Sequence, residues 1–289
     1  MLTKEQFLAH IRPAPLLLDG ATGSNLRKAG MPLGCCAEEW ILANPEKLVA
    51  LQRQYVEAGS DVLYAPTFQA QPIALKQAGL DKHTEAINAH LVALSRSVSA
   101  QVLIAGDLTT MAAFLDSFDE SNFDTMVDAY RRQIRGLIDG GVDYLAAETL
   151  LYPLEAEAIL TAAELEGAGA VTYTFTMQPD GSLFSGRDAG PVLRELEQAG
   201  AAAVGFNCVA ASQLLPALVS KLSRYTKAPL ICKPNAGDPV VDASGIAQYS
   251  MEPDAFADIM RSCREMGASL LGGCCGTTPE HIRAVKCRL

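Results

Sequence analysis

The sequence lacks the features of a membrane or nucleic-acid-binding protein. No run of apolar residues approaches the ~20 that a membrane-spanning helix needs. The net charge is −10 and no basic cluster offsets it, which argues against binding to nucleic acid or to anionic membranes. The first ten residues contain no basic region followed by an apolar core, so we expect a cytoplasmic protein and not a secreted one.

Histidine is scarce, and cysteine is too sparse for a disulfide framework. None of the four histidines follows a predicted strand, so they offer no hydrolytic triad. The eight cysteines include two adjacent pairs, Cys35-Cys36 and Cys274-Cys275, which favours free or metal-bound thiols in a reducing compartment. Adjacent cysteines are poor disulfide partners, because their Cα atoms lie about 3.8 Å apart and disulfides usually need ~4.4–6.8 Å.

Short apolar runs alternate along the chain with longer amphipathic segments. The short runs are apolar throughout, as strands buried on both faces are, and they span 15–19, 61–65, 102–107, 143–148, 170–175, 202–207, 229–233 and 269–271. The longer segments are predicted helices at 45–58, 82–100, 122–139, 153–166, 188–198, 211–222, 252–265 and 278–286. Several of these helices end at glycine, the expected stop signal.

Eight strand–helix units predict a (β/α)8 TIM barrel, formed by residues 1–289 as a single α/β domain. A doubly wound open sheet is the alternative. Its Gly-rich dinucleotide loop is absent, because Gly20-Ala21-Thr22-Gly23 after the first strand does not match GxGxxG. No linker, repeat or low-complexity stretch divides the chain, and residues 27–39 and 237–250 are predicted to be long loops.

Polar and thiol side chains follow most of the predicted strands. In a TIM barrel the chemistry takes place at the carboxyl ends of the strands. The residues at those ends are Asp19, Thr67, Asp107, Glu148, Asn207-Cys208, Lys233-Pro234-Asn235 and Cys274-Cys275. Side chains that are far apart in the sequence are therefore expected to converge on one rim.

Cys208 and the Cys274-Cys275 pair form a candidate site for a metal held by three thiolates. Strands six and eight lie two apart in a closed barrel, so their ends can face a common point. Three protein ligands and one open position is the arrangement of catalytic zinc. For Cys208 alone the alternative is a buried small hydrophobe. Cys35-Cys36, in a predicted loop, is a weaker candidate for a second pair of ligands.

Two acids and two asparagines on the same rim are candidates for substrate binding. Together Asp19 and Glu148 suit a cationic group, such as the ammonium of an amino acid. Each also has a structural alternative: Asp19 as the cap of the following turn, and Glu148 as a solvated residue at a strand exit. Asn207 and Asn235 either orient a ligand or satisfy loop backbone.

The chain resembles the zinc-dependent homocysteine S-methyltransferase family. Two segments carry the resemblance, Gly-Gly-Cys-Cys-Gly-Thr-Thr-Pro-Glu-His-Ile at 272–282 and Gly-Phe-Asn-Cys at 205–208. Weaker matches follow in order along nearly the whole chain, among them Leu-Asp-Gly-Ala-Thr-Gly at 18–23 and Pro-Asn-Ala-Gly at 234–237. The last of these and the cysteine motif are most similar to the homocysteine domain of cobalamin-dependent methionine synthase, and less similar to the betaine-dependent branch.

The resemblance implies a barrel whose Zn²⁺ is held by Cys208, Cys274 and Cys275. It also implies that Asp19 and Glu148 contact the amino-acid end of homocysteine, with Thr67 close by. Zinc binding makes a coordinated sulfur a thiolate, the nucleophile that attacks a methyl group to give methionine.

The resemblance leaves the methyl donor open. No folate or cobalamin module follows the barrel, so the donor is either small (S-methylmethionine, S-adenosylmethionine or betaine) or a separate methyl-corrinoid protein. The motifs similar to methionine synthase favour the corrinoid protein. Two positions on the rim facing the donor depart from the family pattern: Pro66 stands where asparagine is frequent, and Gly106–Thr110 has no Gly-Pro.

Two other classes of function compete with a methyltransferase. A non-catalytic thiol- or zinc-binding protein would share the cysteines, but it gives no role to Asp19 and Glu148. A metal-dependent hydrolase on the same barrel is the weakest hypothesis. Its site usually needs histidine and carboxylate ligands, and no histidine ends a predicted strand.

Overall fold

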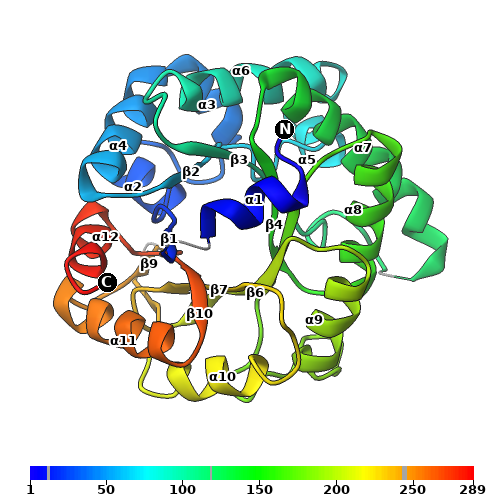
Figure 1. Cartoon of the computed structure of the whole chain (residues 1–289). Helices are drawn as coiled ribbons and strands as arrows, with labels where there is room; N and C mark the ends of the chain where they lie inside the picture. The colour runs from blue at the N-terminus through cyan, green and yellow to red at the C-terminus, as the bar shows by residue number, and fades with distance from the viewer. Residues whose placement is uncertain (12–13, 118, 243–245) are drawn as a thin grey trace.

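The computed structural model describes residues 1–11, 14–117, 119–242 and 246–289, and it confirms the predicted barrel. Eight parallel strands form one sheet in the order β1-β10-β7-β6-β5-β4-β3-β2 (Figure 1). They are β1 (Leu16–Leu17), β2 (Val62–Tyr64), β3 (Leu103–Thr109), β4 (Tyr144–Leu150), β5 (Val171–Phe175), β6 (Ala203–Ala210), β7 (Leu230–Asn235) and β10 (Ala268–Leu271). A doubly wound sheet reverses its strand order at a switch point, which this sheet does not do, so that alternative is wrong.

Two carboxylates join β1 to β2, the two ends of the sheet. The backbone N–H of Asp61 donates to the carbonyl of Leu17 at 2.7 Å, and Asp61 Oδ2 accepts from the N–H of Leu17 at 2.8 Å. Beyond the end of β1, Asp19 Oδ2 accepts from the N–H of Tyr64 at 2.9 Å. Because β1 is only two residues long, side-chain acceptors replace part of the ladder between main chains.

The predicted helices are present and surround the strands (Figure 1). They are α4 (Pro45–Ala58), α6 (Thr84–Arg96), α7 (Phe123–Gly140), α8 (Pro153–Leu165), α9 (Ala189–Gln198), α10 (Leu215–Leu222), α11 (Pro253–Glu265) and α12 (Pro279–Lys286). Proline occupies the first turn of α4 and Gly59 ends it at φ +101°, the left-handed conformation that glycine adopts without a steric penalty. In the described part of the chain, no helix combines the length and the apolar character needed to cross a bilayer.

The structure adds short elements that the sequence patterns did not reveal. The additions include α1 (Lys4–Ile11), α2 (Gly23–Lys28), α3 (Ala37–Ala43), α5 (Pro72–Leu75) and an antiparallel hairpin of β8 (Val240–Val241) and β9 (Ala247–Gln248). The predicted loops at 27–39 and 237–250 are therefore partly regular. Such elements are too short for hydrophobic periodicity to reveal. The sequence does hold one signal for α1, a capping box formed by Thr3 and Gln6. In the structure Thr3 N–H donates to Gln6 Oε1 at 2.8 Å, and Gln6 N–H donates to Thr3 Oγ1 at 3.3 Å.

Four of the predicted strands were ended too early. Strand β3 continues to Thr109, β4 to Leu150, β6 to Ala210 and β7 to Asn235. Asp107, Glu148 and Cys208 therefore lie inside strands. The polar side chains near these ends made the strands look shorter than they are.

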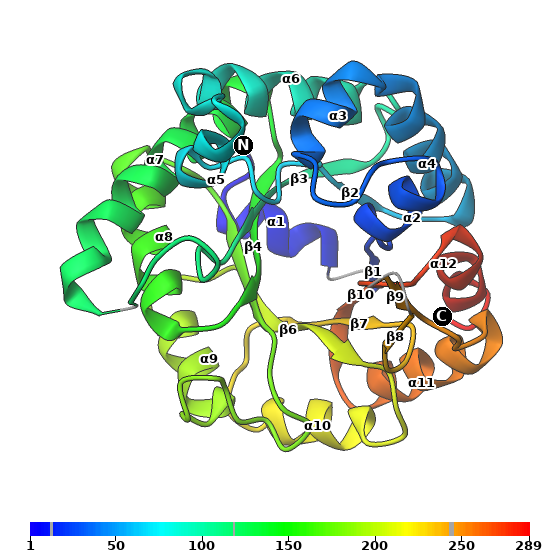
Figure 2. The same cartoon turned by 180° about the vertical axis from the view of Figure 1, so that it is seen from behind.

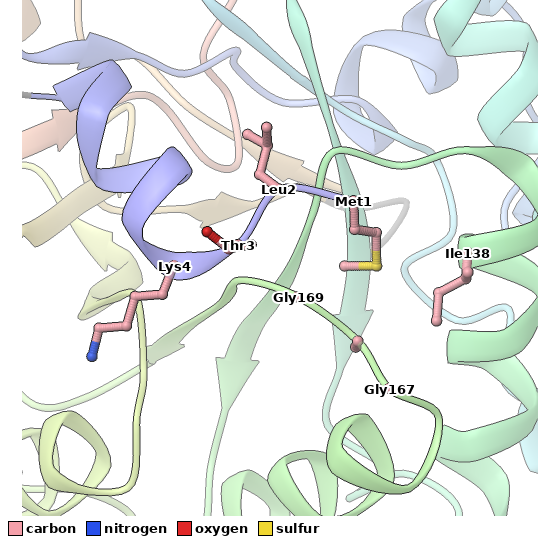
Figure 3. A pocket seen from close by; sticks show the side chains of 8 residues that line it. Met1, Leu2, Thr3, Lys4, Ile138, Gly167 and Gly169 are labelled. Atoms are coloured by element: carbon pink, nitrogen blue, oxygen red, sulfur yellow. The ribbon is translucent and has the colours of Figure 1, made fainter.

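Helix α1 covers the end of the barrel where the strands begin. It crosses that end in Figure 1, and the ring of its fully buried Phe7 lies 4.8 Å from the ring of Tyr144. Leu2 anchors the segment before it: its N–H donates to Asp143 O at 2.7 Å, and its carbonyl accepts from Ala170 N–H at 2.8 Å. Figure 3 shows this segment beside Gly167 and Gly169.

The small side chains inside the barrel leave room for this plug. The buried interior cluster is Phe7, Leu16, Leu18, Val62, Tyr64, Ala105, Tyr144, Ala146, Ala170, Ala202, Ala203, Ile231 and Leu270. Many of these are alanines, so Phe7 and the two tyrosines supply much of the volume. Because α1 fills this end, solvent and ligands can enter the barrel interior only from the opposite end. Figure 2 is viewed from that opposite end, where the β8–β9 hairpin lies beside β7 and β10.

Phe7→Ala tests the plug. We expect the free energy of unfolding in urea to fall by about 3–5 kcal/mol, because the ring leaves a cavity that its neighbours cannot fill. Phe184→Ala, whose side chain is 54% exposed, is the matched control and should change stability by less than about 0.5 kcal/mol. Equal losses in the two variants would show that α1 does not seal the barrel.

Candidate metal and substrate site

Cys208, Cys274 and Cys275 lie together at the carboxyl ends of β6 and β10. Their Sγ atoms are all within 4.8 Å of one another, and all three residues are partly exposed. Sulfur ligands around a tetrahedral zinc ion with ~2.3 Å bonds lie about 3.8 Å apart, so modest side-chain rotations bring this set to metal-binding distance. Within the described residues this thiol cluster is the one group of three or more potential metal ligands.

A tight turn lets the two adjacent cysteines share one site. The N–H and the hydroxyl of Thr277 both donate to the carbonyl of Cys274, at 3.1 and 2.7 Å. Gly276 occupies the third position of the turn at φ +81°, and a Cβ there would lie 2.3 Å from the side chain of Tyr249. The cysteines are therefore outside regular strand geometry, in which neighbouring side chains point to opposite faces.

Cys208 reaches the same point through a distortion of β6. Its φ is +57°, a conformation uncommon for residues other than glycine. The register between β6 and β7 shifts between Asn207 and Ala210, so Cys208 sits in a bulge that redirects its side chain. Strand β4 has a similar irregularity, where Thr149 has φ +59° beside a shift in the register with β5.

The side chain of Asn207 connects these irregular strands. Its Oδ1 accepts from the N–H of Thr149 at 2.7 Å and from the hydroxyl of Thr174 at 2.9 Å. Its Nδ2 donates to Thr149 Oγ1 at 2.7 Å and to Cys274 Sγ at 3.9 Å. The carboxamide, which is fully buried, thus links β4, β5 and β6 to the thiol cluster.

The thiols influence one another's protonation. Hydrogen bonds from Cys208 and Cys274 hold the pKa of Cys275 well below the usual range, and a bond from Tyr249 adds to this effect. The same contacts raise the pKa of Cys208, because its proton is shared with the other two sulfurs. One thiolate therefore forms readily at neutral pH, and thiolates are the form of cysteine that binds metal.

A cluster of buried charges lies beside the thiols, and we refer to Asp19, Asp107, Glu148 and Lys233 as the charged cluster. Each of its residues is at most 6% exposed. Lys233 Nζ donates to Glu148 Oε2 at 2.8 Å and lies 4.0 Å from the centre of the Tyr64 ring. Four strands or strand ends thus contribute charge to the interior of the barrel.

Burial shifts the pKa of every member of this cluster. It raises the pKa of Asp19 to about 7, even though Lys233 opposes the shift. It also raises the pKa of Asp107, with help from the charge of Glu148, and that of Glu148, which Lys233 again opposes. Burial alone would lower the pKa of Lys233, but the surrounding carboxylates outweigh it and raise that pKa.

Three buried acceptor atoms of the strand-end residues have no hydrogen-bond partner among the described residues. They are Asp19 Oδ1, Asp107 Oδ1 and Asn235 Oδ1. A buried acceptor left without a donor costs free energy, so such atoms suit a ligand that brings several N–H donors. The structural alternatives for the two acids are wrong: Asp19 bonds across strands to Tyr64, and Glu148 is not solvated.

Thr67 and the first cysteine pair form their hydrogen bonds with groups outside the thiol cluster. The fully buried hydroxyl of Thr67 donates to Asp107 O at 2.9 Å and accepts from Asp107 N–H at 3.1 Å, so it ties the end of β2 to β3. Cys35 Sγ donates to Pro32 O at 3.2 Å and Cys36 Sγ to Glu38 Oε2 at 3.5 Å. Neither cysteine joins a cluster of three potential ligands in the described ranges.

The sequence predicted no role for Asp107 and Lys233 beyond their positions at strand ends. A signal was present for Lys233, since lysine at the end of the apolar run Leu230-Ile231-Cys232 is unusual in a strand buried on both faces. Tyr249 had no such signal, because it lies in a segment predicted to be loop.

Fold and site together define a class, a (β/α)8 barrel with a thiol cluster and a buried charged cluster at the carboxyl ends of its strands. The chain matches the homocysteine S-methyltransferase family over residues 16–289. It belongs to this family.

Curated relatives cover the chain almost completely. The homocysteine S-methyltransferase of Escherichia coli is 29% identical in an alignment 296 positions long, which covers 94% of this chain and 94% of that relative. The methionine synthases of Mycobacterium leprae and Mycobacterium tuberculosis are each 29% identical in an alignment 286 positions long, which covers 92% of this chain and 24% of theirs. The chain therefore spans about a quarter of the length of these two relatives.

Solved structures show the same fold. The metallated form of the homocysteine methyltransferase MmuM from Escherichia coli aligns with a TM-score of 0.84 and 27% identity, over 98% of this chain and 100% of that one. Its apo form aligns with a TM-score of 0.72 and 25% identity, over 95% and 96% of the two chains.

Asp19→Asn tests the charge balance through pH. A carboxyl whose pKa is raised to about 7 adds most to stability below its ordinary value of 3.8, and this contribution is lost as pH rises to 7. The variant should therefore unfold in urea like the parent protein near pH 4, and be more stable by on the order of 1–4 kcal/mol at pH 8.

Asp128→Asn, at an acidic side chain that is 78% exposed, is the control for this comparison. It should show no pH-dependent gain. A loss of stability in Asp19→Asn at pH 8 would contradict the interpretation, because it would mean that the ionised Asp19 stabilises the fold.

Proposed function

We propose that this protein transfers a methyl group to the thiol of homocysteine to give methionine, with Zn²⁺ as its cofactor and residues 1–289 acting as one homocysteine-binding domain. The observation that carries the proposal is the convergence of three thiols within 4.8 Å beside a buried charged cluster. The family to which the chain belongs supports the same substrate.

The three cysteine sulfurs are suitable ligands for zinc. Cys208, Cys274 and Cys275 supply three soft sulfur ligands, and three protein ligands leave a fourth tetrahedral position open. Zinc, when bound, holds a substrate thiol as a thiolate at neutral pH, where a free thiol with a pKa of ~8.5 is mostly protonated. The chain's own part is to fix the sulfurs, through the turn at Gly276 and through the carboxamide of Asn207.

The charged cluster is the proposed site for the amino-acid end of homocysteine. Asp19 and Glu148 would bind its ammonium, since Asp19 Oδ1 is buried without a donor and Glu148 is almost fully buried. Asn235 Oδ1 offers a further acceptor. Thr67 and Asn207 act as positioning residues, because their polar atoms bond to Asp107 and to the thiol-bearing strands.

We favour a methyl-corrinoid carried by a separate protein as the methyl donor. Five apolar side chains between 50 and 68% exposed lie in the segments that connect a barrel strand to the helix after it, on the site side of the barrel: Leu33, Phe184, Leu214, Val240 and Val241. A protein docking over the strand ends would cover them, whereas a small donor needs no such surface. Similarity to the methionine synthases agrees with this choice.

A small donor, such as S-methylmethionine, S-adenosylmethionine or betaine, is the second candidate. The Escherichia coli homocysteine S-methyltransferase favours it, because this chain covers 94% of that relative but only 24% of the methionine synthases.

Zinc content tests the metal site. The purified protein should hold about one zinc per chain, and Cys275→Ser should lose it, because two thiolates and an open site bind zinc far more weakly than three. Cys287→Ser, at an exposed thiol outside the cluster, is the matched control and should keep its zinc. Elemental analysis after dialysis measures the content. Methionine formation that survives complete removal of metal would refute the zinc-dependent mechanism.

A comparison of donors tests the reaction. Homocysteine is supplied with methylcobalamin, free or bound to a corrinoid protein, or with S-methylmethionine, S-adenosylmethionine or betaine, and methionine is measured. We expect the highest kcat/KM with methylcobalamin, and Val241→Asp should slow transfer from protein-bound methylcobalamin without affecting small donors. A preference for a small donor would overturn the corrinoid proposal. Zinc binding without methionine from any donor would favour the non-catalytic thiol–zinc protein.

A further inference from the structure

Lys233 is an unusual residue for the interior of a barrel. It is 4% exposed, and no other lysine or arginine in the described parts of the chain is buried to this degree. It belongs to β7, whose six residues are all buried. A lysine is retained in such a place only where its charge is paired, because removing an ammonium from water is otherwise very costly.

The surroundings of Lys233 hold more negative than positive charge. Glu148 forms the 2.8 Å ion pair, and Asp19 and Asp107 also act on the lysine by charge. The ring of Tyr64, 4.0 Å from Nζ, adds a cation–π contact. Only one carboxylate thus has Lys233 as a direct partner, while Asp19 Oδ1 and Asp107 Oδ1 have no hydrogen-bond donor in the described parts of the chain.

An amino-acid substrate brings charges of both signs into this space. Its ammonium matches the carboxylates, but its α-carboxylate would be repelled by each of the three acids that is ionised. Lys233 is the one buried side-chain cation in the described chain that can receive that α-carboxylate. Its ammonium has three donors on a flexible four-carbon stem, so it can turn from one acceptor to another.

We propose that Lys233 is a specificity-determining residue that exchanges ion pairs when substrate binds. In the empty site it pairs with Glu148; in the complex it pairs with the α-carboxylate of the amino acid and releases Glu148 to the substrate ammonium. Tyr64 keeps the lysine close during the exchange. The site then selects thiols that carry both an ammonium and a carboxylate. This inference rests on the proposed function.

Calorimetric titration of the zinc-loaded protein with three thiols tests the exchange without a methyl donor. The ligands are homocysteine, 3-mercaptopropylamine, which lacks the carboxylate, and 4-mercaptobutyrate, which lacks the ammonium. Lys233→Met should weaken homocysteine binding about 10- to 100-fold, the loss expected when a charged hydrogen bond is removed. Binding of 3-mercaptopropylamine should stay unchanged or become tighter, because the lysine no longer competes for Glu148. Lys233→Arg should restore part of the preference for homocysteine.

Two further variants keep the test decisive. Asp107→Asn combined with Lys233→Met removes one charge of each sign, so it should fold even if the single variant does not, and it should show the same selective loss. Lys221→Met, which breaks a surface pair with Asp188, is the matched control and should bind all ligands normally.

The possible outcomes separate the two proposals. If Lys233→Met weakens homocysteine and 3-mercaptopropylamine equally, or weakens neither, the lysine only balances charge and the exchange is wrong. If the zinc-loaded parent protein does not bind homocysteine at all, the proposed function fails and this inference fails with it.

Discussion

Glu148 on β4 and Lys233 on β7 form an ion pair of 2.8 Å across the interior of the barrel. This pair allows four ionisable side chains to be buried at the end of the barrel that is open to substrate, because the lysine offsets part of the charge of the three acids. Without it, burial would shift each carboxyl group further toward its neutral form. The site could then not present the charges that an amino acid requires, so both the substrate proposal and the further inference depend on this pair.

The thiol cluster depends on departures from regular strand geometry. Cys208 and Thr149 have positive φ in two strands of the same sheet, and the turn at Gly276 holds the other two cysteines. The carboxamide of Asn207 bonds to Thr149 and to Cys274, so it helps to hold both the irregular part of β4 and the turn with the adjacent cysteines. Strained backbone of this sort persists only where its surroundings hold it, and it concentrates at functional sites.

The two ends of the barrel are built for different purposes. At the end where the strands begin, Phe7 and Tyr144 fill the space left by small interior side chains. At the other end, the interior holds the charged cluster and the partly exposed thiols, and exposed apolar side chains lie in the segments after the strands. Stability and chemistry are thereby separated along the barrel axis, as is usual for this fold.

The sequence by itself determined the barrel and the identity of the thiols. Alternating apolar runs and glycine stops predict the eight barrel strands and the helix after each of them, and a closed barrel brings the ends of strands six and eight together. The sequence did not determine the exact ends of β3, β4, β6 and β7, the short elements such as α1 and β8–β9, or the role of Lys233. Glu148 and Lys233 are 85 residues apart, and neither has a local pattern that selects the other. Only closure of the sheet decides which buried charges meet, because the free energy of a buried charge depends on its neighbours in space and not on its neighbours in sequence.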